Sequence, residues 1–111
     1  MTETAKLAAS DGQARDGFGG SVGITGNSVV IGACPQSGMC NVQGKVYVFL
    51  KPKSGWKTTQ TFNAELASSD GMTNDEFAAS VGISGTTIVA GAPLATIGAN
   101  LSQGAAYVFG K

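Results

Sequence analysis

The sequence contains no histidine among its 111 residues, so it lacks the side chain that most often serves as a general base. A Ser-His or Cys-His nucleophile pair is therefore excluded, and so is a metal site that relies on imidazole ligands. The seven acidic residues fall mostly in predicted turns and offer little for paired-carboxylate chemistry. We therefore predict that the chain has no catalytic residue and is not an enzyme.

Charged residues are also scarce, at 13% of the chain, and seven basic residues balance seven acidic ones. The sequence has no basic patch that would bind nucleic acid or anionic lipid. No apolar run is long enough to span a bilayer, and residues 1–6 lack the apolar core of a signal peptide. These absences favour either a cytosolic protein or an excised segment that carries an added Met.

Proline occurs only three times and cysteine twice, whereas glycine occurs 17 times. The glycines lack a three-residue period, which excludes a collagen-like chain. Short runs of Val and Ile lie between them, a pattern typical of short strands joined by tight turns. No stretch combines helical periodicity with capping residues, so we predict an all-β chain.

One stretch of the sequence occurs twice. Residues 5–33 match residues 64–92, which lie 59 positions later, at 16 of 29 positions without a gap. A second match, at an offset of 60, relates residues 44–49 to residues 104–109. A repeat of this length indicates a stacked or radial architecture.

The expected strands follow the same order in both copies, with hairpin turns at Gly26-Asn27 and Gly85-Thr86. They are Thr2–Ala8, Phe18–Thr25, Ser28–Ala33, Lys45–Leu50, Trp56–Ala67, Phe77–Ser84, Thr87–Ala92 and Ala105–Phe109. If the four strands of one unit are called a to d, the chain runs d-abc-d-abc. Four-stranded units that repeat radially are blades of a β-propeller. We therefore predict that residues 1–111 form one segment of two antiparallel blades, with repeat 1 at about 5–55 and repeat 2 at about 64–111.

These residues resemble the FG-GAP repeat, the β-propeller repeat of integrin α chains. Phe18-Gly19 and Gly91-Ala92-Pro93 match the two motifs that give the family its name. Phe77-Ala78 departs at its second position, and Gly32-Ala33-Cys34-Pro35 carries a cysteine before its proline. The surrounding Ala-Ser-Asp-Gly context looks like the bacterial extracellular branch. The resemblance implies an extracellular or cell-surface module that recognises protein or carbohydrate, as in cell adhesion.

Two blades cannot close a ring, and an isolated pair would expose two apolar faces. We therefore expect a cyclic homo-oligomer with head-to-tail contacts, and we favour six blades in a trimer over eight in a tetramer. Thr2–Ala8 of one subunit is expected to pair with strand c of the next, near Tyr107–Phe109. The alternative is a fragment of a longer propeller, or an engineered pair of blades with no function of its own.

Four aspartates in the loops between strands d and a are weak candidates for a cation site. They are Asp11, Asp16, Asp70 and Asp75. Calcium would suit such oxygen ligands, but we favour the alternative that these side chains cap turns. The calcium loop of the resembled family falls at residues 25–28 and 84–87, which have too few carboxylates for that site to be carried over. We therefore predict neither a metal nor another cofactor.

Three further positions attract attention. Cys34 and Cys40 have five residues between them, and we predict a disulfide, which would favour an oxidising compartment. Asn100 begins a glycosylation sequon in a loop, and a bacterial origin would leave it unused. Most aromatic residues alternate along strands and are interpreted as core. Trp56 follows the predicted turn at Lys51–Gly55 and is our candidate for ligand contact, including stacking on a sugar.

Overall fold

The described residues form two antiparallel sheets. The computed structural model describes residues 2–11, 17–33, 44–67, 77–93, 97–100 and 103–110. The first sheet has the order β1-β2-β3-β4 and the second β5-β6-β7. Their bounds are β1 Phe18–Thr25, β2 Ser28–Ala33, β3 Lys45–Leu50, β4 Ala64–Leu66, β5 Ser80–Ser84, β6 Thr87–Ala92 and β7 Ala105–Gly110. Within these residues no helix is long and apolar enough to cross a membrane.

The two hairpins that open the sheets have the predicted turns. Gly26 and Gly85 occupy the first central position of each turn, with φ angles of +49° and +56°. Positive φ at that position is the requirement of a type II′ turn, whose twist matches that of the flanking strands. Glycine meets the requirement without steric cost, and the register beyond each turn is therefore the same in both repeats.

Side chains of each sheet alternate between two faces, which the register of the strands defines. The aromatic face carries Phe18, Val22, Ile24, Ile31, Tyr47 and Phe49 in the first sheet and Val81, Ile83, Ile88, Ala90, Tyr107 and Phe109 in the second. The valine face carries Val30, Val46 and Val48 in the first sheet and Val89, Ala106 and Val108 in the second. Equivalent residues of the two repeats therefore share equivalent faces.

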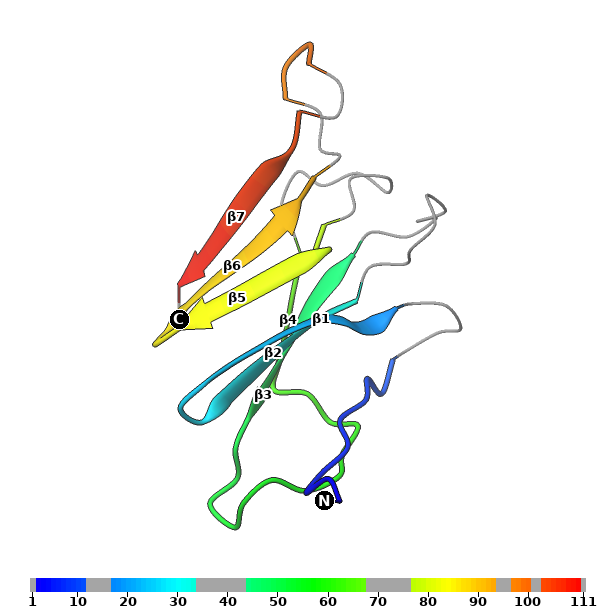
Figure 1. Ribbon diagram of the computed structural model, residues 1–111, viewed down its shortest axis with the longest axis vertical. Coiled ribbons are helices and arrows are strands. Elements are labelled where there is room, and N and C mark those ends of the chain that lie inside the picture. The colour runs from blue at the N-terminus through cyan, green and yellow to red at the C-terminus, as the bar shows by residue number, and fades with distance from the viewer. Residues whose placement is uncertain are drawn as a thin grey trace.

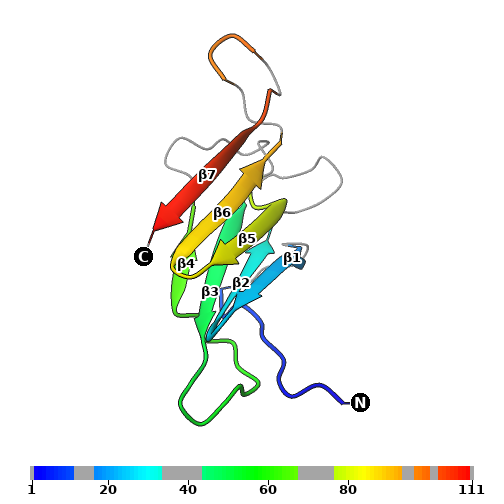
Figure 2. The same cartoon turned by 60° about the vertical axis from the view of Figure 1, so that its left-hand side comes forward.

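The main core lies between the sheets, where the valine face of the first packs on the aromatic face of the second. Val30, Val46 and Val48 are buried there together with Phe77 and Ile88. Figures 1 and 2 show the sheets lying against each other, with β1 and β5 as neighbours. This contact has the polarity of neighbouring propeller blades, because unlike faces of equivalent sheets meet in it.

A second cluster covers part of the aromatic face of the first sheet, over β2 and β3. Tyr47 and Phe49, each 1% exposed, are packed beneath side chains from two irregular segments. We call these covering side chains the cap, and they are Leu7, Ala9, Trp56 and Phe62. The segments that carry them run past each other at the lower end of the molecule in Figure 1. The cap therefore packs on the aromatic face of the first sheet, as the valine face of the first sheet packs on the aromatic face of the second sheet.

Two of the predicted strands differ from the structure: one does not form, and the other is shorter than predicted. In both cases the residues that leave the strand belong to the segments that carry the cap. Thr2–Ala8 forms no strand, and Leu7 makes only an isolated parallel bridge to Thr59. Of Trp56–Ala67 only Ala64–Leu66 forms a strand, β4, which pairs with β3. Residues 56–62 leave the ladder because Trp56 and Phe62 pack on the aromatic face, whereas a continued β4 would place both on the valine face, on the same side as Ala64 and Leu66.

The predicted strand Phe77–Ser84 begins late, because β5 starts at Ser80. Ala78 has a φ of +75°, and its equivalent Gly19 has a φ of +92° at an irregularity in β1. The second position of the Phe-Gly motif thus requires left-handed backbone, which costs a residue with a Cβ about 1–2 kcal/mol. Ala78 nevertheless keeps this geometry, since it is 1% exposed and its N–H donates to the Gly91 carbonyl at 2.9 Å.

Candidate functional site

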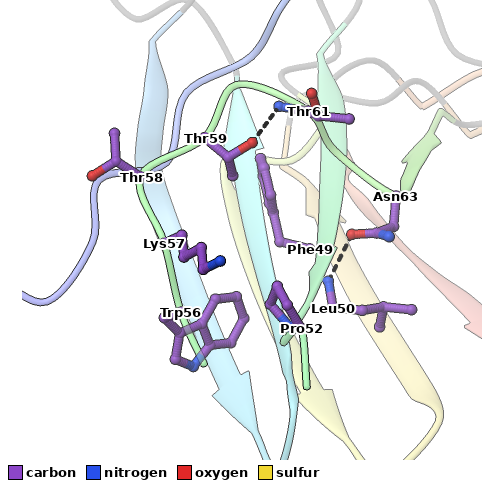
Figure 3. Close-up of a pocket in the computed structure, with 9 residues that line it drawn as sticks. All are labelled: Phe49, Leu50, Pro52, Trp56, Lys57, Thr58, Thr59, Thr61 and Asn63. Atoms are coloured by element: carbon purple, nitrogen blue, oxygen red, sulfur yellow. Dashed lines mark hydrogen bonds between the residues drawn. The ribbon is translucent and has the colours of Figure 1, made fainter. Parts of the chain in front are cut away.

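A shallow pocket of about 290 Å³ lies where β3 leaves the first sheet. Its apolar lining consists of Trp56, Pro52 and Phe49 (Figure 3). The rest of the lining comes from the polar connection to β4 and from the end of β3. These residues are Leu50, Lys57, Thr58, Thr59, Thr61 and Asn63.

Hydrogen bonds fix the polar side of this pocket. The Leu50 N–H donates to Asn63 Oδ1 at 2.8 Å, and the Thr61 N–H donates to Thr59 Oγ1 at 3.0 Å (Figure 3). The indole of Trp56 is held from behind by the second core cluster, so one part of the ring is packed and another lines the pocket. An aromatic wall beside hydroxyl and amide groups is suited to a polar ligand that has an apolar face.

Asp11 is tied into a small charged cluster at the edge of the first sheet. It accepts a hydrogen bond from the Tyr47 hydroxyl, 2.9 Å from its Oδ1. Lys45 Nζ lies 3.7 Å from Asp11 Oδ2 and 3.3 Å from Glu65 Oε1. The hydrogen bond from Tyr47 is the main reason why the pKa of Asp11 lies below its usual value, with contributions from Glu65 and from the charge of Lys45.

Replacing Asp11 by Asn is expected to flatten the acid limb of the stability curve. Because the pKa of Asp11 is lowered on folding, its carboxylate stabilises the fold above the unfolded value of about 3.9. That stabilisation is lost as the pH falls through the folded pKa. Melting temperatures across this acid range should therefore fall less steeply for Asp11→Asn than for the wild type. Glu3→Gln, at an exposed position, is the control, and equal slopes for all three proteins would contradict the assignment.

Most of the other predicted site residues lie in parts of the chain that the structure does not describe. Asp16, Asp70, Asp75, Cys34 and Cys40 lie outside the described residues, so the weak cation candidates and the disulfide stay predictions. Within the residues that are described, no group of three or more acidic, Cys or His side chains is placed to hold a metal ion.

Asn100 is exposed beside a two-residue turn. It exchanges backbone hydrogen bonds with Ile97, and its Nδ2 donates to Gln103 Oε1 at 2.9 Å. The first residue of the sequon is therefore accessible.

Trp56, predicted to contact a ligand, lines the pocket, and its role there stays a prediction. Sequence reasoning missed the charged cluster and the cap. Asp11 and Tyr47 are 36 positions apart, and only the fold brings them together. One signal was available, because Asp11 and Tyr47 both recur in the second repeat, as Asp70 and Tyr107. Recurrence of both partners of a pair would have justified predicting the contact.

Comparison with known proteins adds one finding. A family model described as FG-GAP repeat matches residues 1–49 and matches again over residues 61–109. The two matches agree with the two copies seen in the sequence and with the two sheets seen in the structure. Comparisons with curated proteins and with solved structures gave no match.

Proposed function

Because the chain belongs to the FG-GAP repeat family, we propose that it is a non-catalytic extracellular binding module whose blades assemble with copies of the same chain into a ring. Repeats of this family form β-propeller blades, are typically extracellular, and generally bind or scaffold. The observation that carries the proposal is a difference in exposure between equivalent residues of the two repeats.

The valine face is buried in the first sheet and exposed in the second. Val30 and Val48 are 0% and 2% exposed, because the second sheet covers them. Their equivalents Val89 and Val108 are 41% and 68% exposed. Since the residues are the same in both repeats, the second valine face has the composition of a blade contact and lacks the blade.

The aromatic face shows the opposite difference. Val81 and Ile83 of the second sheet are partly buried against the main core. Their equivalents Val22 and Ile24 in the first sheet are 64% and 66% exposed, because the cap packs on side chains of β2 and β3 and leaves this part of the edge strand β1 uncovered. The chain thus offers one uncovered face of each kind, at opposite ends.

These two faces are complementary, because the contact between the sheets already joins a valine face to an aromatic face. A second copy that repeats this contact would place its first sheet on the second sheet of its neighbour. Head-to-tail contacts of this kind close into rings when their rotation allows it. We propose a trimer with six blades, whose repeated loops would bind protein or glycan ligands through several weak contacts at once.

Replacing Val108 by Asp is expected to abolish assembly without unfolding the chain, because Val108 is exposed in the single chain. A buried carboxylate facing an apolar blade is strongly unfavourable, so the mass should fall from three chains to one. Sedimentation velocity over a range of concentrations measures the mass. Ser54→Asp, in an exposed turn, is the control and should assemble like the wild type.

Mixing two assembly-deficient variants tests the polarity of the contact. Val108→Asp destroys the valine face but keeps the aromatic face, and Ile24→Asp does the reverse. The mixture should form a dimer with one intact contact, whereas each variant alone stays a single chain. A wild type that has the mass of one chain at every concentration, or a Val108→Asp variant that still assembles, would contradict the proposal.

The pocket beside Trp56 favours a second candidate function, binding of a neutral saccharide. Its apolar wall would stack on the face of a sugar ring, while the threonines and Asn63 meet the hydroxyls. Trp56 is the single tryptophan of the chain, so its fluorescence reports directly on the pocket.

Titration with a set of neutral oligosaccharides is expected to shift this emission, and Trp56→Ala is expected to weaken binding about tenfold or more, measured by calorimetry. Trp56→Phe retains an aromatic wall and should lose less. Emission unchanged by every sugar would exclude this pocket as a saccharide site.

A further inference from the structure

Acidic and basic residues balance over the chain as a whole but not around the pocket at the end of β3. Between Asp16 and Glu65 the sequence contains four lysines and no acidic residue. Three of the four fall within the seven residues that lead from β3 into the pocket lining. We call Lys51, Lys53 and Lys57 the pocket lysines. In a chain with only 13% charged residues they form a local concentration of positive charge.

The fourth lysine shows what the pocket lysines lack. Lys45, at the start of β3, lies between the carboxylates of Asp11 and Glu65. In the described part of the chain no ion pair of this kind joins a pocket lysine to a carboxylate. The N-terminal segment that runs past residues 58 and 59 carries one acidic residue, Glu3, and Lys6 in the same segment balances it. The charge of the pocket lysines is therefore available to a ligand.

Backbone hydrogen bonds fix the turn that carries two of the pocket lysines. The Lys51 N–H donates to the Asn27 carbonyl at 2.7 Å, and the Gly55 N–H donates to the Pro52 carbonyl at 2.9 Å. The second of these bonds closes a β-turn with Lys53 at a central position. The turn lies at the lower end of the molecule in Figure 1, away from the contact between the two sheets. A backbone that is already ordered lowers the entropic cost of binding there.

The third pocket lysine brings positive charge into the pocket itself. Lys57 lines the pocket next to Trp56, and in Figure 3 its side chain extends from the connection to β4 toward Phe49. The saccharide proposed for this pocket stacks on Trp56 and bonds to the threonines and Asn63, which assigns no role to Lys57. An ammonium group beside a bound sugar ring attracts a carboxylate or sulfate carried by the same glycan.

We propose that the pocket binds an acidic glycan, in which a neutral ring stacks on Trp56 and the carboxylate or sulfate of an adjoining unit pairs with the pocket lysines. The inference rests on the saccharide pocket proposed above and names the class of saccharide. Exposed ion pairs are individually weak, so the pocket lysines together are expected to strengthen binding about tenfold.

A matched pair of glycans tests the contribution of the charge. The acidic probe is a tetrasaccharide that alternates N-acetylglucosamine with glucuronic acid, and the neutral probe is the same tetrasaccharide with its carboxyl groups reduced to alcohols. Titrations followed by Trp56 fluorescence are expected to give a dissociation constant about tenfold lower for the acidic probe at low salt. The difference should shrink as salt is added, because salt screens exposed charges. A sulfated form of the neutral probe, measured in the same way, decides between the two anionic groups.

Lysine variants locate the effect. Lys57→Gln is expected to reduce the preference for the acidic probe about threefold, and replacing all three pocket lysines by Gln is expected to bring its affinity down to that of the neutral probe. Lys45→Gln removes one positive charge at the other end of β3 and is the control, so it should keep the full preference. Equal losses in Lys45→Gln and Lys57→Gln would overturn the proposal, because net charge alone would then explain the preference.

The remaining outcomes separate this inference from the saccharide pocket. Equal affinity of the wild type for the two probes would overturn the acidic glycan and leave the saccharide pocket in place. A thymidine tetranucleotide that binds as tightly as the acidic probe would also overturn it, since phosphates and stacking bases would then satisfy the site equally well. If neither probe changes the emission of Trp56, the acidic glycan is wrong, and the neutral oligosaccharides described above decide separately whether the pocket binds a saccharide.

Discussion

Replacing Phe77 by Ala is expected to cost about 4 kcal/mol of unfolding free energy. Phe77 is 1% exposed, and its ring makes edge contacts with Tyr107 at 5.5 Å and Phe109 at 6.1 Å. It also belongs to the core that joins the two sheets. The truncation therefore opens a cavity at the blade contact and removes the aromatic pairs at the same time.

The repeat provides the matched control. Phe18 is the equivalent of Phe77 and makes the same edge contacts, with Tyr47 at 5.4 Å and Phe49 at 6.3 Å. It is only partly buried, beneath the cap, so Phe18→Ala is expected to cost about 2 kcal/mol. Urea denaturation of both variants measures the difference. Equal losses would mean that the contact between the sheets contributes no more stability than the cap.

The difference between these two phenylalanines shows how far the sequence predicts the fold. Alternation in residues 18–25 and glycine in the turns suffice for the hairpins, because both depend on local geometry. The repeat correctly implies two equivalent sheets. The repeat cannot show which sheet covers the other, since Phe18 and Phe77 are both phenylalanines at the same position of the same motif.

The N-terminal segment could not be placed from sequence for a related reason. Residues 5–8 have the sequence of a fourth strand, yet a strand forms only where a neighbouring strand is available. Residues 64–66 pair with β3 of the same repeat, whereas residues 5–8 make an isolated bridge from Leu7 to Thr59. Local sequence therefore predicts the strand, and tertiary context decides whether it pairs.

Trp56 is the one residue lining the pocket that the sequence analysis singled out. The predicted turn at Lys51–Gly55 suggested that the indole of Trp56 is accessible, and the structure places this ring at the wall of a pocket. The polar side depends on Asn63 turning toward the Leu50 N–H, across a connection that was predicted as regular strand. Had residues 56–62 continued β4, Trp56 would lie on the valine face with Ala64 and Leu66, away from Phe49 on the aromatic face.

Replacing Gly44 by Ala is expected to destabilise the chain by about 3 kcal/mol through overpacking. Gly44 is buried directly before β3, and a Cβ there would overlap the carbonyl oxygen and carbon of Phe77. Both are backbone atoms, so no side-chain rotation relieves the clash. The start of β3 must move away from Phe77, which loosens the contact between the two repeats at this point.

Thermal unfolding of Gly44→Ala, with Gly110→Ala as the control, measures the effect. Gly110 lies in β7 and has open space where a Cβ would stand, so its substitution should leave the melting temperature nearly unchanged. Phe77→Ala and Gly44→Ala act on the same contact from opposite directions, one by a cavity and one by excess volume. The loss of stability in the double variant should therefore be smaller than the sum of the losses in the two single variants. A contact that one substitution has already loosened contributes less stability for the other to remove.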